Sequence, residues 1–133
     1  MSCKSLLYTA LTADTVVAAE GLVPVGNLIR RFGRAIQLDG NNINLTEPGY
    51  YNISMNMTVL PTSSAAISAE ILENGIPVSG SKTTATPTAA SASTLLTIPS
   101  STVRVYCYST KSIAIQLSAT GTVRNMSLTI TKE

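Results

Sequence analysis

The most constraining feature of this sequence is a strict alternation of side-chain type between Tyr51 and Val59. Apolar residues occupy the odd positions, and every even position between them is polar. Successive side chains of a β-strand point to opposite faces, so a period of two predicts a strand with one face in a core. A helix would mix the two sets, and the preceding Pro48-Gly49 pair marks a turn. We therefore expect the chain to be built as β-strands around this one.

Short alternating runs bounded by turn residues continue along the chain. The Asn74-Gly75 pair predicts a tight hairpin, and Gly40 with Asn41 predicts a second hairpin or a kinked strand pair. Residues 65–75 also fit helical spacing, but the hairpin signal after them favours a strand. Residues 22–33 contain two glycines and a proline, which favours an extended crossing segment over a helical turn. Further strands are expected at residues 6–12, 15–19, 36–38, 43–45, 93–99, 102–109, 112–119 and 122–132, with a polar strand and a loop within 79–92.

About nine or ten strands without a helix predict an all-β antiparallel sandwich. At 133 residues and 13.9 kDa the chain fits one domain, residues 1–133. Its core is expected to receive the apolar face of the central strand and the matching faces of the last strands. These core residues are Tyr51, Ile53, Met55, Met57, Val59, Cys107, Ile113, Ile115, Leu117, Met126, Leu128 and Ile130.

Aromatic residues on the second faces of the strands suggest a contact between subunits. Tyr50, Tyr106 and Tyr108 lie on strands whose other faces already supply a core, and rings with polar tips suit an interface. The first strand is partly apolar on both faces, which suits burial between the core and a neighbour. Tyrosines are also common on free surfaces, and the polar ladder of the central strand could face solvent instead. The candidate interface residues are Tyr8, Tyr50, Asn52, Asn56, Tyr106 and Tyr108.

The residue inventory argues against catalysis. The chain has no histidine, and its seven carboxylates are scattered without a recognisable pairing, whereas general acid and base chemistry needs such groups together. It has neither a nucleophilic serine elbow nor a glycine loop for phosphate. We therefore expect no enzyme activity, no catalytic residue and no cofactor.

A metal site is not expected either. Cys3 and Cys107 are too few for a disulfide framework or a zinc site. Cys107 is in phase with the apolar face of its strand, which favours a small buried side chain over a reactive thiol. Asp39 and the asparagines after it could offer oxygen ligands to calcium, but turn chemistry explains the same residues.

The charge pattern disfavours nucleic acid and membranes as partners. Charged residues are 12 % of the chain and the formal net charge is +2, too low for a concentrated basic stripe. Arg30, Arg31 and Arg34 form a local cluster, which we interpret as a solvated loop or an ion-pairing patch at a subunit contact. No apolar run approaches the roughly 18 residues of a membrane span, and no signal peptide is recognisable.

Several of these motifs together resemble the jelly roll of the tumour necrosis factor and complement globular-head superfamily. The resemblance covers most of the chain and implies a jelly-roll sandwich that forms a homotrimer. The stretches MSCKS, RRFG and PGYYNIS are in addition similar to small proteins encoded by phages and prophages of Gram-positive bacteria. The motifs that carry the superfamily resemblance are Gly49, Tyr51, Ile53 and Met55 in the central strand, Asn74-Gly75 in the hairpin, and Leu128 and Ile130 in the last strand.

The resemblance implies a structural protein of a phage particle, either a trimeric head decoration or a fibre module. Such a protein is made in the host cytoplasm and resides on the virion surface. Its partners would be itself, capsid or fibre proteins, and in some cases a glycan or protein of the host surface. The alternative is a trimeric binding module of a bacterial cell surface or spore coat that recognises glycan or protein.

Overall fold

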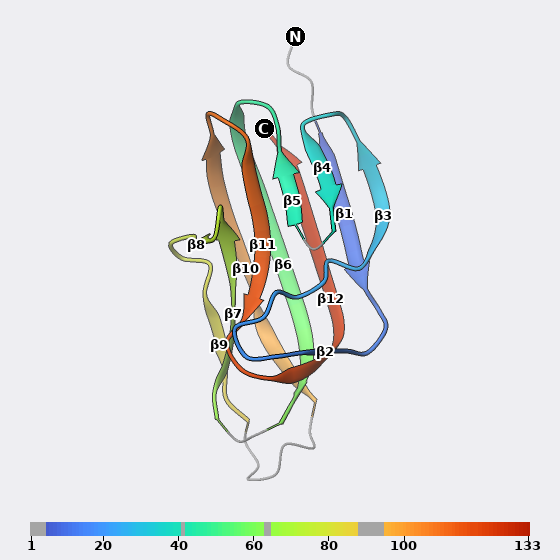
Figure 1. Cartoon of the computed structure of the whole chain (residues 1–133), viewed down its shortest axis with the longest axis vertical. Coiled ribbons are helices and arrows are strands. Elements are labelled where there is room, and N and C mark those ends of the chain that lie inside the picture. The colour runs from blue at the N-terminus through green and yellow to red at the C-terminus, as the bar shows by residue number, and fades with distance from the viewer. Residues whose placement is uncertain (1–4, 41, 63–64, 88–94) are drawn as a thin grey trace.

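The computed structural model describes residues 5–40, 42–62, 65–87 and 95–133. Within these ranges all regular secondary structure is β-strand. Two six-stranded antiparallel sheets face each other (Figure 1). The prediction of an all-β antiparallel sandwich is confirmed. The described strands are β1 (Leu6–Leu11), β2 (Thr15–Val17), β3 (Asn27–Phe32), β4 (Ile36–Asp39), β5 (Asn42–Leu45), β6 (Gly49–Pro61), β7 (Ile67–Glu73), β8 (Ile76–Pro77), β9 (Thr83–Ala85), β10 (Leu96–Cys107), β11 (Lys111–Leu117) and β12 (Gly121–Lys132).

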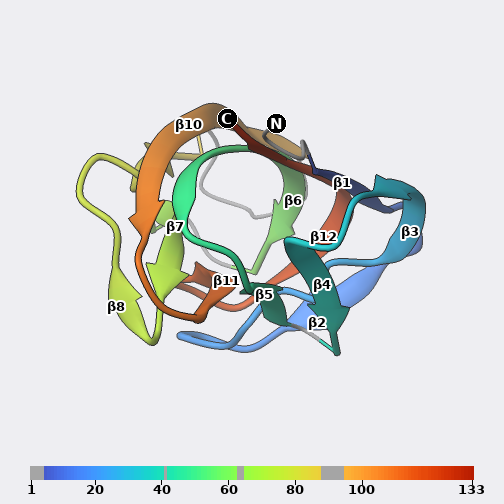
Figure 2. The same ribbon diagram turned by 90° about the horizontal axis from the view of Figure 1, so that it is seen from above.

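The two sheets divide the strands without regard to their order in the chain. Sheet A has the order β10-β6-β12-β1-β3, with β2 beside β12. Sheet B has the order β4-β5-β11-β7-β8, with β9 beside β7. Seen from above, the sheets curve around a common interior (Figure 2). Apart from the β4–β5 and β7–β8 hairpins, neighbouring strands such as β6 and β12 are mostly far apart in the chain.

The core lies between the sheets and is organised around β6. This strand pairs with β10 on one side and β12 on the other, so its apolar face lies in the middle of sheet A. All twelve side chains expected in the core are at most 1 % exposed. Burial of this much apolar surface is the main stabilising contribution to such a sandwich.

β10 is one strand where the sequence suggests two. The expected strands at 93–99 and 102–109 merge into Leu96–Cys107, while residues 93 and 94 lie outside the described residues. The register against β6 shifts between Ile98 and Ser101, which is a bulge that contains Pro99. A proline cannot donate to a strand ladder, and bulges on edge strands tolerate it. β10 is the edge of sheet A, so the proline interrupts the pattern without ending the strand.

The segment expected to cross the molecule is extended, but its second half is a strand of sheet A. Leu22 forms an antiparallel bridge with Gln116, and the backbone NH of Val23 donates to the Ile115 carbonyl at 2.8 Å, so the first half runs beside β11 in sheet B. The chain then returns through Gly26 to β3, which pairs with β1. All six residues of β3 are exposed, so the strand has no apolar alternation that could have identified it.

Both expected hairpins form. In the turn between β7 and β8, Asn74 and Gly75 have φ values of 51° and 82°, and two central residues with positive φ are typical of the type I′ turn. β4 and β5 pair across Gly40, which has a φ of 61°, while Asn41 lies outside the described residues. Residues 67–73 are a strand, as favoured over a helix. The polar strand expected within 79–92 is β9, and residues 88–92 are outside the described part.

Candidate functional site

Five of the six residues expected at a subunit interface lie on the outer face of sheet A, and the sixth, Tyr108, lies in the turn at one end of it. Tyr8 is on β1, Asn52 and Asn56 are on β6, and their sequence neighbours on each strand point into the core. Burial alternates along each strand, and this alternation places the half-buried or exposed side chains of Tyr8, Tyr50, Asn52, Asn56 and Tyr106 opposite the core. The remaining three are tyrosines at one end of the face: Tyr50 on β6, Tyr106 on β10 and Tyr108 just after it.

The middle of this face is a continuous band of hydroxyl and amide side chains. Ser54 on β6 lies opposite Thr102 on β10 and Thr129 on β12, and Thr129 in turn lies opposite Tyr8. The hydroxyl oxygens of Ser54 and Thr102 are 3.1 Å apart. One row along β6, Ser127 donates to Asn56 Oδ1 at 2.9 Å. These cross-strand pairs satisfy each other within the face, which leaves a neutral surface with few charges to desolvate.

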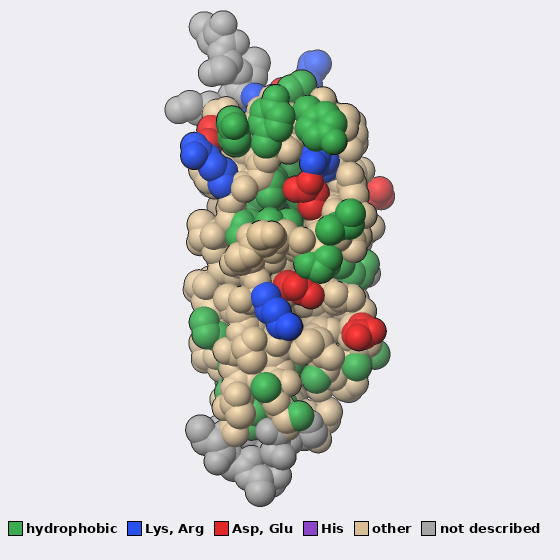
Figure 3. Space-filling view, turned by 90° about the vertical axis from the view of Figure 1, so that its left-hand side faces the viewer, with side chains coloured by type: hydrophobic (Ala, Val, Ile, Leu, Met, Phe, Trp, Pro, Cys, Tyr) green, Lys and Arg blue, Asp and Glu red, His purple; other side chains and the backbone are tan. Residues whose placement is uncertain are grey.

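The tyrosines form an aromatic cluster at one end of the face. The ring centroids of Tyr50 and Tyr106 are 4.9 Å apart, and those of Tyr106 and Tyr108 are 6.3 Å apart. The three residues are 51 %, 49 % and 70 % exposed. Figure 3 shows hydrophobic side chains gathered at this end of the molecule. An exposed cluster of amphipathic rings is a feature of protein interfaces.

Beside the tyrosines, Arg104 and Glu133 form an ion pair, so their opposite charges balance each other. Arg104 Nε donates to Glu133 Oε2 at 2.8 Å, and Asn52 Nδ2 donates to Glu133 Oε1 at 2.9 Å. The Arg104 guanidinium, followed by the Asn52 amide, lowers the pKa of the Glu133 carboxyl. The same guanidinium lies 5.2 Å from the centre of the Tyr50 ring. Beside the aromatic cluster, side chains from β6, β10 and the residue after β12 thus form one connected group.

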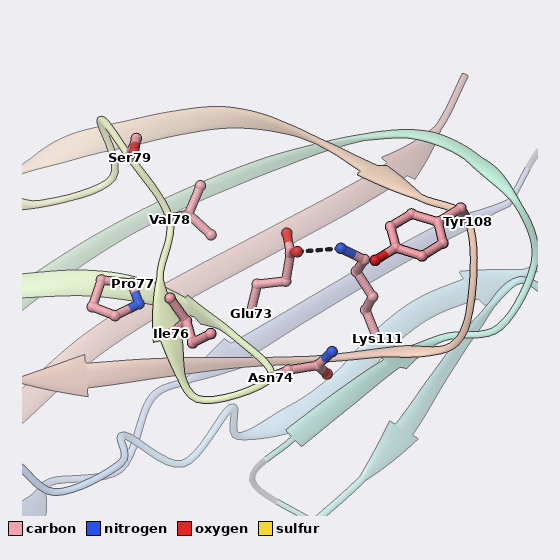
Figure 4. Close-up of a pocket in the computed structure, with 8 residues that line it drawn as sticks. All are labelled: Glu73, Asn74, Ile76, Pro77, Val78, Ser79, Tyr108 and Lys111. Atoms are coloured by element: carbon pink, nitrogen blue, oxygen red, sulfur yellow. Dashed lines mark hydrogen bonds and ion pairs between the residues drawn. The ribbon is translucent and has the colours of Figure 1, made fainter.

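A second feature is a cavity of about 410 Å³ between the β7–β8 hairpin and the turn after β10. Figure 4 shows the side chains of Glu73 and Lys111 pointing toward each other across it, with the Tyr108 ring beside them. Lys111 Nζ is 4.9 Å from the centre of that ring. The hydrogen bond to Glu73 raises the pKa of Lys111, which keeps the ammonium charged. Because each ion is occupied by the other, neither is available as a free acid or base.

The structure also locates the residues considered for other chemistry. Cys107 is fully buried, and its thiol donates to the Ser109 carbonyl at 2.8 Å. Burial raises the pKa of this thiol, which disfavours the reactive thiolate. Asp39 and Asn42 face each other across the β4–β5 turn. Among the described residues, no three histidine, cysteine or acidic side chains come together as a metal would require.

The Glu73–Lys111 and Arg104–Glu133 pairs could not be found from sequence. Their partners are 38 and 29 residues apart and meet only because β7 lies beside β11 and the end of β12 lies near β10. No helix in the described part of the chain is long and apolar enough to span a membrane.

Comparison with known proteins identifies the fold. No protein-family model and no curated protein sequence matches the chain. Among solved structures, murine APRIL superposes with a TM-score of 0.75 at 11 % identity, over 98 % of this chain and 100 % of the other. The globular domain of zebrafish complement 1qA gives 0.71 at 12 % identity, over 95 % and 94 %. The PRD1 vertex protein P5 gives 0.62 at 11 % identity, over 96 % of each chain. The chain therefore has the jelly-roll fold of the tumour necrosis factor and C1q-like domains, as its motifs suggested.

Proposed function

We propose that the chain is a non-enzymatic structural protein of a phage particle that assembles as a homotrimer through the outer face of sheet A. It would serve as a head decoration or a fibre module on the virion surface. Its partners would be two further copies of itself and a capsid or fibre protein. The observation that carries the assembly is the composition of the face between Tyr8 and Tyr106.

A sheet face that only meets water usually carries interspersed charges. The band that includes Ser54, Asn56 and Thr129 is instead neutral and hydrogen-bonded within itself. The aromatic cluster continues the band at one end, and its Arg104–Glu133 pair is already neutralised. Removing water from such a surface costs little free energy, and its tyrosine rings offer a large area for contact. A closed ring of three copies would gather this face of each subunit around the threefold axis.

The phage role rests on a likeness of fold and on sequence stretches. The vertex protein P5 of the phage PRD1 has the same fold over nearly all of both chains. The RRFG and PGYYNIS stretches resemble small proteins of phages and prophages of Gram-positive bacteria. A structural virion protein needs stability and a symmetric contact surface, which the two sheets and the outer face of sheet A would supply.

The alternative is a trimeric binding module of a bacterial cell surface or spore coat. The globular domain of complement 1qA has the same fold, so the fold also supports this function. The exposed rings of Tyr106 and Tyr108 could then stack on a sugar or pack against a protein loop. Both functions share the trimer and differ in what the free surfaces bind.

The assembly is tested by placing a charge in the middle of the face. In Ser54→Arg a guanidinium replaces the hydroxyl that contacts Thr102, and burying it without a partner should break the trimer into monomers. Ser112→Arg makes the same change on the outer face of sheet B and should leave the mass unchanged. Light scattering measures the mass, and circular dichroism checks that both variants fold. A Ser54→Arg protein with the wild-type mass would refute this interface.

The phage role is tested with particles. Phage particles purified from a host that produces the chain should carry it in a fixed ratio to the major capsid protein, measured by quantitative mass spectrometry. Its absence from purified particles, together with its presence on the cell surface, would replace the phage role with the alternative.

A further inference from the structure

β3 is a free edge of sheet A. It pairs with β1 on one side and ends the strand order on the other, and no further backbone hydrogen bond is made by its residues within the described ranges. Figures 1 and 2 both show it at the outer margin of the molecule. An antiparallel edge strand presents a row of unpaired NH and carbonyl groups that can accept another strand.

The side chains of β3 are unusual for such an edge. Leu28, Ile29 and Phe32 are 45 %, 56 % and 53 % exposed. A shallow cavity of about 380 Å³ lies along residues 28–33. Natural edge strands are normally short, charged or covered, because exposed apolar edges invite pairing. β3 does have two arginines and a register shift against β1, as free edges often do, but its three exposed apolar residues are unusual there and suit a surface that a partner covers.

The same strand carries positive charge without a matching carboxylate. Arg30 and Arg31 are on β3 and Arg34 follows it, and none of them forms an ion pair with a described acidic residue. Arg31 is held by the Ile36 carbonyl at 3.1 Å and by Gln37 Oε1 at 2.7 Å, both neutral acceptors. The edge is thus both apolar and basic.

We propose that β3 is a docking edge for an extended acidic segment of a partner protein, which adds as a strand beside β3. Main-chain hydrogen bonds would supply affinity, apolar side chains would cover Leu28 on one face of β3, and carboxylates would pair with Arg30 on the other face and with Arg34 beyond the strand. A polypeptide fits better than nucleic acid or a lipid surface, because only a polypeptide matches unpaired main-chain groups. Three arginines on a chain of net charge +2 are also few for binding phosphate backbones.

This site adds a partner surface to the proposed assembly role and does not depend on the trimer. The bonds it uses point outward along the margin of sheet A, whereas the proposed subunit contact uses the face of that sheet. A monomeric wild-type protein would refute the trimer and leave the docking edge intact. A wild-type protein that forms trimers but does not bind the acidic peptide would refute only the docking edge.

The probe is the peptide acetyl-Glu-Val-Glu-Val-Glu-Val-amide, titrated into the ¹⁵N-labelled full chain and followed by amide chemical shifts. The expected shifts are concentrated in β3 and in the turn that follows it. A matched peptide with lysine in place of glutamate should bind at least about tenfold more weakly, because its charges oppose those of the arginines. A third peptide, methylated on alternate backbone nitrogens, should also lose binding because it cannot complete a strand ladder.

The variant Arg34→Glu should weaken binding of the acidic peptide by about tenfold or more. Arg34 is chosen because it lies outside the proposed subunit face and its side chain is exposed. Lys82→Glu makes the same charge change near β9, at the opposite side of the molecule, and should leave binding unchanged. Unchanged affinity in Arg34→Glu, or shifts that fall outside β3, would overturn the proposal. Equally tight binding of a DNA duplex or an anionic phosphatidylserine vesicle would overturn the choice of a polypeptide partner.

Discussion

Single residues on β6 separate the roles of the two faces of sheet A. The Tyr51 ring is completely buried, and its hydroxyl donates to the Glu47 carbonyl at 2.6 Å. The next residue, Asn52, points to the outer face and bonds to Glu133. Neighbouring residues of one strand thus belong to different structures, the core of the subunit and the proposed contact between subunits.

Replacement of Tyr51 should therefore cost far more than replacement of its neighbour. We expect Tyr51→Ala to lower the free energy of unfolding by about 3 to 5 kcal/mol, because it leaves a large cavity. Asn52→Ala should lower the same quantity by less than about 1 kcal/mol when measured at a concentration where the protein is monomeric. Urea unfolding measures both. Similar losses for the two variants would contradict the division of roles on β6.

Burial of Tyr51 also predicts a dependence of stability on alkaline pH. Burial raises the pKa of Tyr51 from 10.0 to about 12 in the folded protein, because the phenolate is poorly solvated there. The neutral ring therefore contributes stability that is complete below pH 10 and is lost as the pH rises through 12. The loss amounts to about 2 to 3 kcal/mol for two pKa units.

Urea unfolding between pH 9 and 12 tests this expectation, with Tyr51→Phe as the control. The phenylalanine variant cannot ionise, so its stability should fall less across this range. Parallel curves for the variant and the wild type would show that Tyr51 does not cause the alkaline loss.

At the scale of elements, the turn into β3 depends on one glycine. Gly26 has a φ of 82°, and a Cβ atom placed there would lie 2.3 Å from the Ala10 carbonyl oxygen. That contact is with the backbone of β1, the strand beside which β3 lies, so it cannot be relieved by a side-chain rotation. The chain can turn back onto the sheet at this point because glycine has no Cβ atom to meet this carbonyl oxygen.

Gly26→Ala should therefore destabilise the protein more than the conformational cost of a positive φ alone. That cost is about 1 to 2 kcal/mol for an L-residue. Gly40→Ala is the control, because Gly40 has a φ of 61° and a Cβ atom placed there would have no described atom within 4 Å. We expect Gly26→Ala to exceed Gly40→Ala by at least about 1 kcal/mol in urea unfolding. Equal losses would mean that the contact with β1 is easily relieved.

The elements also show how far a sequence of this kind can be interpreted. β6 and the Asn74-Gly75 hairpin are predictable because alternation and turn chemistry are local signals. β3 is not, because a strand exposed on both faces has no alternation. The sequence predicts two strands in place of β10 because a proline such as Pro99 usually ends a strand, and the bulge that accommodates it has no local sequence signal. The Glu73–Lys111 pair depends on the neighbourhood of β7 and β11, which no local pattern encodes.

For the whole molecule, the proposed function needs one surface for assembly and another for a partner. The outer face of sheet A is neutral and aromatic at one end, and the β3 edge is apolar and basic. The six candidate interface residues follow from sequence alone, and five of them share one face because alternation places them opposite the core, while Tyr108 lies in the turn after β10. Whether another copy covers that face depends on contacts between subunits, which local sequence patterns do not show.

The mass of the purified wild-type chain in solution tests the central proposal most directly. Light scattering across a hundredfold dilution should give a constant mass of three times 13.9 kDa. A constant mass is expected because a neutral face with an aromatic cluster can pack closely enough to hold three subunits together at low concentrations. A mass of one subunit throughout would contradict the trimer and would leave the jelly roll as a monomeric module.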